Sequence, residues 1–105
     1  MKIIETTIFT KKLNSLLSDE EYRNLQNELI LNPEKGKVIR CGGGLRKIRW
    51  GISGRGKSGG VRIIYYWIKN KEIILMLFVY PKNEQDNLTP SQLKILKSLV
   101  EKELQ

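Results

Sequence analysis

The chain has 105 residues, a hydrophobic content of 40% and a formal net charge of +8. This length predicts one domain, spanning residues 1–105, with a single modest core, and the composition excludes a disordered tail. The chain lacks an apolar run of the roughly 20 residues needed to cross a bilayer, and one cysteine cannot form an internal disulfide. We therefore expect a cytoplasmic protein. Because histidine is absent, Ser-His and Cys-His nucleophile pairs and His-based zinc sites are excluded, and we expect neither a metal nor another cofactor.

The N-terminal third predicts a short strand followed by two helices. Residues 2–8 alternate weakly between polar and apolar, which favours a strand, and apolar residues recur at helical spacing from Phe9 onward. Ser18 and Glu21 have the spacing of a capping box, so a second helix is expected to begin there. Asn32-Pro33 ends that helix, because the residue before a proline disfavours helical geometry. The two helices form a hairpin.

The middle and the C-terminal third predict an antiparallel meander. Residues 45–50 and 61–68 have strand character, and the second of these segments is rich in β-branched and aromatic residues. Residues 69–71 form a tight turn into residues 72–80, which are nearly all apolar and are expected to be buried on both faces of the sheet.

A last helix is expected to begin at Thr89-Pro90-Ser91-Gln92, where threonine is the N-cap and proline the first helical residue. Its core-facing residues are predicted to be Leu93, Leu96, Val100 and Leu104. The expected fold class is α+β, with the N-terminal helical hairpin and the C-terminal helix packed on one side of a small, twisted, mainly antiparallel sheet.

The glycine-rich segment contains two motifs of nucleotide-binding proteins. Residues 51–58 match the phosphate-binding pattern GxxxxGK[ST], and residues 54–59 match GxGxxG. Both patterns require a helix directly after the glycines, because the phosphate binds at the helix N-terminus. Here Gly59-Gly60 and a strand follow. The segment therefore favours a basic hairpin loop that contacts a phosphate backbone over a nucleotide-hydrolysing site.

The positive charge is concentrated in the middle of the chain. No aspartate or glutamate occurs between Lys35 and Lys71, whereas the flanking helices are charge-balanced. Such a basic region predicts a polyanionic partner, with a basic surface kept only for solubility as the alternative. The residues of this region expected to contact that partner are Arg46, Arg55, Lys57, Lys35 and Lys37.

Four further cations are predicted to converge on one face of the sheet. Side chains alternate along a strand, so Lys47 and Arg49 share a face while Ile48 points into the core. Antiparallel pairing across the glycine loop can bring Arg62 beside them, and Lys82 follows the buried strand at the same edge. Like charges repel at close range, so this arrangement points to an anionic ligand, unless each cation merely edges a solvated strand.

Such a cluster can cleave RNA without histidine. When the ribose 2′-hydroxyl attacks the adjacent phosphate, a lysine of depressed pKa can accept the hydroxyl proton. Arginine forks can stabilise the charge that develops on the phosphorus oxygens. Holding the RNA in line supplies much of the remaining rate, so cleavage of free RNA is expected to be weak.

The order and spacing of several motifs resemble the RelE superfamily of type II toxins. These are GGLRKIR at 43–49, GVRIIYY at 60–66 and YPKNE at 80–84, joined by a Gly/Lys loop. LSDEEY at 17–22 and LNP at 31–33 make the chain most similar to the HigB-type branch. The resemblance implies a RelE-like fold and an mRNA interferase acting in the ribosomal A site. It also implies a helix-turn-helix antitoxin encoded beside the toxin, with operator DNA bound only through that antitoxin.

The resemblance carries four site residues over to this chain. Lys47 and Arg49 match the family's paired basic positions, Arg62 its phosphate-contacting arginine, and Lys82 a basic position after the third long strand. Asn83 stands where the RelE pattern has a further arginine, and no tyrosine follows in residues 87–89. The resemblance thus implies catalytic roles for these four cations but leaves the general base and general acid open.

Two other functions stay open at the level of sequence. The related ParE toxins share the fold but inhibit DNA gyrase, and fold alone does not decide function. A non-catalytic RNA-binding module is the other alternative. It needs exposed aromatic platforms for the bases, whereas Tyr65, Tyr66 and Trp67 lie in a strand expected to be mainly buried.

Overall fold

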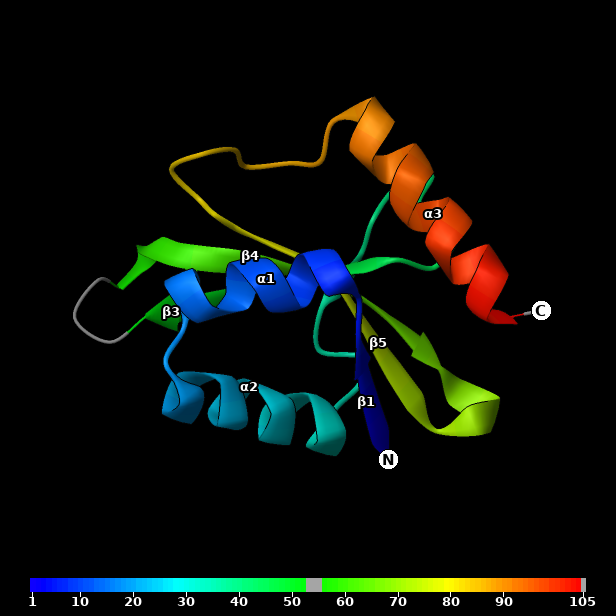
Figure 1. Cartoon of the computed structure of the whole chain (residues 1–105), viewed down its shortest axis with the longest axis horizontal. Coiled ribbons are helices and arrows are strands. Elements are labelled where there is room, and N and C mark those ends of the chain that lie inside the picture. The colour runs from blue at the N-terminus through cyan, green and yellow to red at the C-terminus, as the bar shows by residue number, and fades with distance from the viewer. Residues whose placement is uncertain (53–55, 105) are drawn as a thin grey trace.

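The computed structural model describes residues 1–52 and 56–104. Helices and strands together form an α+β fold, as expected (Figure 1). The strands are β1 (Lys2–Glu5), β2 (Lys37–Val38), β3 (Arg46–Ile52), β4 (Gly56–Ile68) and β5 (Ile73–Pro81). The helices are α1 (Thr7–Leu16), α2 (Asp19–Leu31) and α3 (Pro90–Leu104). A short 3-10 turn, η1 (Lys69–Lys71), joins β4 to β5.

The strands form one sheet in the order β1-β5-β4-β3-β2. All neighbouring pairs are antiparallel except β1, which lies parallel to β5. The first strand is shorter than predicted, because the hydroxyl of Thr6 accepts a hydrogen bond from the Phe9 amide and begins α1 at Thr7. The prediction that the glycine-rich segment is a loop up to residue 60 is wrong, since β4 already begins at Gly56 and pairs there with Ile52 of β3.

Two predicted helix starts are confirmed. The Ser18 hydroxyl accepts from the Glu21 amide at 3.1 Å while the Glu21 carboxylate accepts from the Ser18 amide at 2.8 Å, which completes the capping box. Thr89 and Gln92 make the same reciprocal pair at the start of α3, at 3.1 and 3.0 Å. None of the helices in the described part of the chain is long and apolar enough to cross a membrane.

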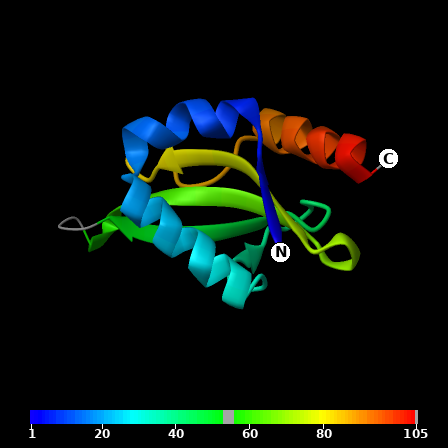
Figure 2. The same cartoon turned by 60° about the horizontal axis from the view of Figure 1, so that its bottom comes forward.

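The helices cover both faces of the sheet, so the prediction that all of them lie on one side is wrong. Side chains of α1 and α2 pack with Ile48, Ile63 and Val79 in one core cluster, and α1 runs along β5 (Figure 2). Leu96 and Val100 of α3 pack in a second cluster on the opposite face. Figure 1 shows α2 at the bottom and α3 at the top right, with strands between them.

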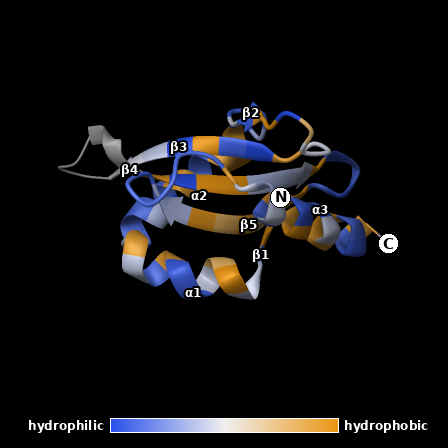
Figure 3. Cartoon of the chain, turned by 90° about the horizontal axis from the view of Figure 1, so that it is seen from above, coloured by the Kyte–Doolittle hydropathy of each residue, from blue (hydrophilic) through white to orange (hydrophobic). Residues whose placement is uncertain are grey.

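The central strands explain why helices pack on both faces of the sheet. Every residue of β5 from Ile74 to Tyr80 is buried, as the apolar run predicts, and Figure 3 shows this strand coloured mainly as hydrophobic. An apolar strand of this kind exposes hydrophobic side chains on both faces unless both are covered. The last turn of α3 extends past the sheet's core, so the predicted core residue Leu104 is 45% exposed.

Candidate functional site

Three neighbouring strands place polar side chains next to one another on the face that α3 covers. Arg62 of β4 pairs with Arg49 of β3 on one side and with Tyr80 of β5 on the other. Lys47 lies two residues before Arg49, and therefore on the same face, with Lys37 of β2 directly opposite it. Directly opposed residues of neighbouring strands have their side chains on the same side of the sheet. The fold thus brings together Lys47, Arg49 and Arg62, as the strand pattern predicts.

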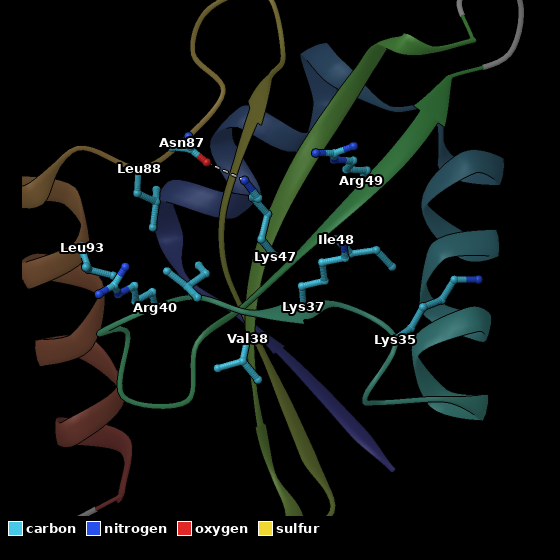
Figure 4. A pocket seen from close by; sticks show the side chains of 11 residues that line it. Lys35, Lys37, Val38, Arg40, Lys47, Ile48, Arg49, Asn87, Leu88 and Leu93 are labelled. Atoms are coloured by element: carbon cyan, nitrogen blue, oxygen red, sulfur yellow. Dashed lines mark hydrogen bonds between the residues drawn. The ribbon is translucent and has the colours of Figure 1, made fainter.

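A hollow of about 600 Å³ opens beside these cations. Cationic side chains, apolar side chains and Asn87 line it together (Figure 4). The cations that line it are Lys35, Lys37, Arg40, Lys47 and Arg49. The apolar residues are Val38, Ile39, Ile48, Leu88 and Leu93. A lining that combines positive charge with apolar side chains suits a ligand that carries both phosphate and an uncharged ring system.

Lys47 makes two hydrogen bonds to the segment between β5 and α3. Its Nζ donates to Asn87 Oδ1 at 2.8 Å, drawn as the dashed line in Figure 4, and to the Asp86 carbonyl at 3.4 Å. Partial burial lowers the pKa of Lys47, the Asp86 carboxylate acts against that shift, and the charges of Arg49, Arg62 and Lys37 lower the pKa further. A lysine in these surroundings has a larger neutral fraction near neutral pH than an ordinary lysine, as a general base requires.

Arg62 is almost completely buried, with 2% of its side chain exposed. Among the described residues, its Nη1 donates to the carbonyl of the adjacent Val61, at 3.3 Å. Its Nε is buried without a hydrogen-bond partner in the described part of the chain, and the Asp86 carboxylate lies 3.7 Å away. Burying a guanidinium with so few acceptors is costly, which is typical of a group that meets its partner only when a ligand binds.

Sequence reasoning missed three residues of this face. Tyr80 is fully buried beside Arg62, and its hydroxyl donates to the Asp86 carbonyl at 3.1 Å. Burial raises the pKa of Tyr80 to about 12, so the hydroxyl keeps its proton. Asp86 and Asn87 come from the segment between β5 and α3. Their place on the cationic face follows from tertiary contacts with Arg62 and Lys47, and no local sequence pattern indicates it.

Arg46 lies apart from the central cations, whereas Lys82 follows directly after β5 at the end of the sheet near Arg62. Arg46 is paired with Tyr65, whose ring belongs to the core cluster of α1 and α2, so it points to the opposite face of the sheet. Its Nη1 donates to the carbonyls of Glu34 at 3.2 Å and Gly36 at 2.9 Å. Lys82 follows the end of β5, where its amide donates to the Gly60 carbonyl at 3.1 Å. Lys82 thus lies at the end of the sheet where it was predicted, near Arg62. Arg46, in contrast, projects from the face opposite to Lys47.

The other predicted contact residues are placed unevenly. Lys37 lines the hollow beside Lys47, and Lys35 lines its outer edge while pairing with Glu28 at 2.5 Å. Arg55 lies outside the described residues, and of Lys57 only the backbone is described, near the start of β4. Arg40, which was not among the predicted contact residues, also lines the hollow.

The phosphate-loop reading of the glycine-rich segment is excluded, as predicted. The residues Gly56–Ser58 of the GxxxxGK[ST] pattern belong to strand β4, so the helix that would bind the phosphate is missing at that place. The groups on this chain that are suited to bind a phosphate are instead the side-chain cations of the sheet. The arrangement of Lys47, Arg49 and Arg62 can bind a phosphodiester, neutralise charge that develops on it and accept a proton from a nearby hydroxyl.

Comparison with known protein families identifies one that matches the entire chain. The family is described as the RelE toxin of the RelE / RelB toxin-antitoxin system, and its model matches residues 1–105. This agrees with the resemblance carried by the motifs on β3, on β4 and after β5.

Proposed function

The chain belongs to the RelE toxin family and is the toxin of a toxin–antitoxin pair, and from this premise we propose that it is a ribosome-dependent mRNA endonuclease. The observation that carries the proposal is the convergence of Lys47, Arg49 and Arg62 on one face of the sheet, where Lys47 and Arg49 also line the hollow. We further propose that the chain lies in the HigB-type branch and acts in the cytoplasm, where translation takes place. Its antitoxin is a helix-turn-helix protein, through which alone the pair binds operator DNA.

The reaction we propose is an internal transfer within the RNA. Neutral Lys47 accepts the proton of the ribose 2′-hydroxyl, whose oxygen forms a bond to the adjacent phosphorus. The bond from phosphorus to the 5′-oxygen breaks, which leaves a 2′,3′-cyclic phosphate and a new 5′-hydroxyl end. Arg49 and Arg62 bind the non-bridging oxygens as their charge increases. Lys82, which directly follows β5, donates a proton to the leaving 5′-oxygen.

The ribosome supplies what the chain lacks. Asn83 stands in place of a further arginine, so the proposal places only Arg49 and Arg62 as arginines at the phosphate, and no histidine is present to move protons. Holding the message in the A site fixes the 2′-oxygen, phosphorus and 5′-oxygen in line, and such positioning is worth several orders of magnitude in rate. We therefore expect cleavage of translated message and little cleavage of free RNA.

The proposal is tested by inducing the protein in a bacterium and mapping 5′ ends by primer extension. One transcript is expressed in two copies, of which one is translated and the other lacks a start codon. New ends at codon-phased positions are expected only in the translated copy, and they should vanish with the Arg62→Met variant. Growth arrest without new RNA ends would overturn the proposal in favour of a gyrase inhibitor, and equal cleavage of both copies would overturn the role of the ribosome.

A further inference from the structure

The segment of residues 82–89, which we name the strap, crosses the cationic face on its way from β5 to α3. Its residues Asp86 and Asn87 contact side chains of β3, β4 and β5, namely Lys47, Arg62 and Tyr80. Both ends of the strap are fixed, since β5 ends at Pro81 and Thr89 caps α3. Gln85 adds a hydrogen bond to Gln92 in the first turn of α3, at 2.8 Å.

Oxygen atoms of the strap lie next to Arg62 and Lys47, the cations to which we propose that a phosphodiester binds. The Asp86 carboxylate faces the Arg62 guanidinium, and the Asn87 side-chain oxygen accepts from Lys47. A carboxylate carries the same charge as a phosphodiester and also presents two oxygens. Among the described residues this is the acidic group that acts on Lys47, in a region whose own strands carry only positive charge.

The fit of the strap to Arg62 is poor. The guanidinium has five N–H donors, yet the Asp86 oxygen is 3.7 Å from Nε, which is beyond hydrogen-bond distance. Asp86 itself is 58% exposed, so water screens its attraction to the arginine. A phosphate in direct contact would accept two parallel hydrogen bonds from the same guanidinium and satisfy the orphaned Nε. The contact between Asp86 and Arg62 is therefore one that a phosphate can displace.

We propose that the strap is an autoinhibitory element, in which Asp86 occupies the phosphate position on Arg62 until an RNA phosphate replaces it. The proposal rests on the proposed function in taking RNA as the ligand, but it concerns binding and not cleavage. The Arg62 side chain is 2% exposed and its Nε lies 3.7 Å from Asp86 of the strap, so the proposal requires the strap to move before a phosphate reaches the guanidinium. Tyr80 and Asn87 hold the strap in its closed position through the hydrogen bonds to Asp86 and from Lys47.

The test compares Asp86→Asn with Glu84→Gln, which removes an equal charge from the same strap. Glu84 is exposed, and its described contact is a backbone hydrogen bond to the Pro81 carbonyl. The ligand is a short RNA in which every 2′-hydroxyl is methylated, so that it cannot be cleaved, and binding is followed by fluorescence anisotropy. We expect Asp86→Asn to bind about threefold to tenfold more tightly than the wild type, and Glu84→Gln within about twofold of it.

Two outcomes would overturn the proposal. Equal affinities of the two variants would mean that Asp86 acts only through overall charge. Weaker binding by Asp86→Asn would mean that the carboxylate helps to orient Arg62 for the RNA. Ribosome-dependent cleavage is measured separately on the same proteins. Tighter binding by Asp86→Asn without any cleavage would support autoinhibition by the strap and reject the proposed endonuclease activity.

A second measurement follows Arg62 directly. Its Nε–H signal in a ¹⁵N-labelled protein is monitored by NMR while inorganic phosphate is added, and the signal is expected to shift at lower phosphate concentration in Asp86→Asn than in Glu84→Gln. Tyr80→Phe keeps the buried ring but removes the hydroxyl that donates to the Asp86 carbonyl, so it should shift the titration in the same direction. If phosphate does not shift the Arg62 signal in Asp86→Asn, the proposal that the strap is autoinhibitory is wrong.

Discussion

Arg46 and Arg62 lie on neighbouring strands of one sheet, yet their surroundings are opposite. Arg46 donates to two backbone carbonyls, on Glu34 and Gly36, and so fastens the segment after α2 to β3. Arg62 is buried deeper but has an Nε without a hydrogen-bond partner in the described part of the chain. An arginine that donates hydrogen bonds to backbone carbonyls stabilises the fold. An arginine with N–H donors that lack an acceptor in the protein is suited to bind a ligand.

The largest effect is expected from Arg62→Met. We expect ribosome-dependent cleavage to fall by about 100-fold or more, because a donor to the developing phosphate charge is lost. The melting temperature should stay the same or rise, since a buried cation with few acceptors is replaced by an apolar chain. Single-turnover cleavage and thermal unfolding of the same preparation check both. If cleavage by Arg62→Met stays within about tenfold of the wild type, Arg62 is not the ligand-binding arginine that its contrast with Arg46 indicates.

Lys47→Met is expected to reduce cleavage by about 100-fold through the loss of the general base. In the wild type the rate should rise with pH over the range of about 7 to 9. The sign follows because the neutral amine is the active form and burial and the neighbouring cations hold the pKa of Lys47 below that of an ordinary lysine. Rates measured on a stalled ribosomal complex between these pH values test this. Lys47→Arg should lose the rise with pH, and an unchanged profile would reject Lys47 as the base.

Arg46→Met should instead affect stability. The two carbonyls on Glu34 and Gly36 lose a charged donor, so the free energy of unfolding is expected to fall by about 1–3 kcal/mol. Cleavage should stay within about twofold of the wild type under conditions where the protein is folded. Urea unfolding and the ribosomal assay separate the two effects. A loss of cleavage without a loss of stability would show that both arginines serve the ligand.

The smallest effect is expected from Arg49→Gln on the salt dependence of RNA binding. Arg49 is exposed at the hollow and pairs across the strands with Arg62, so it is placed to contact one phosphate. The slope of log affinity against log salt concentration should decrease by about 0.7–1. Anisotropy titrations of the methylated RNA at several potassium chloride concentrations measure the slope. Arg46→Met is the control. If its slope changes as much as that of Arg49→Gln, RNA contacts both faces of the sheet, and the claim that it binds only the face of Arg49 is wrong.

Local patterns in the sequence determined most of the elements and part of the site. The capping pairs at Ser18 and Thr89 were predictable because each depends on residues three positions apart. The shared face of Lys47 and Arg49 was predictable because side chains alternate along any strand. The order of motifs on the strands was sufficient to indicate the RelE family, which the whole-chain match confirms.

Only the tertiary structure decided which cations are free to bind a ligand. Arg46 stands next to Lys47 in the sequence, but the alternation of the strand turns it to the face where carbonyls satisfy it. Arg62 is enclosed by strands on both sides and meets Asp86 from a segment 24 positions away. The placement of α3 on the second face has a similar cause, since it follows from the burial of β4 and β5 on both sides. Hydrogen-bond satisfaction and burial depend on contacts between distant segments, whereas periodicity reports only on neighbours along the chain.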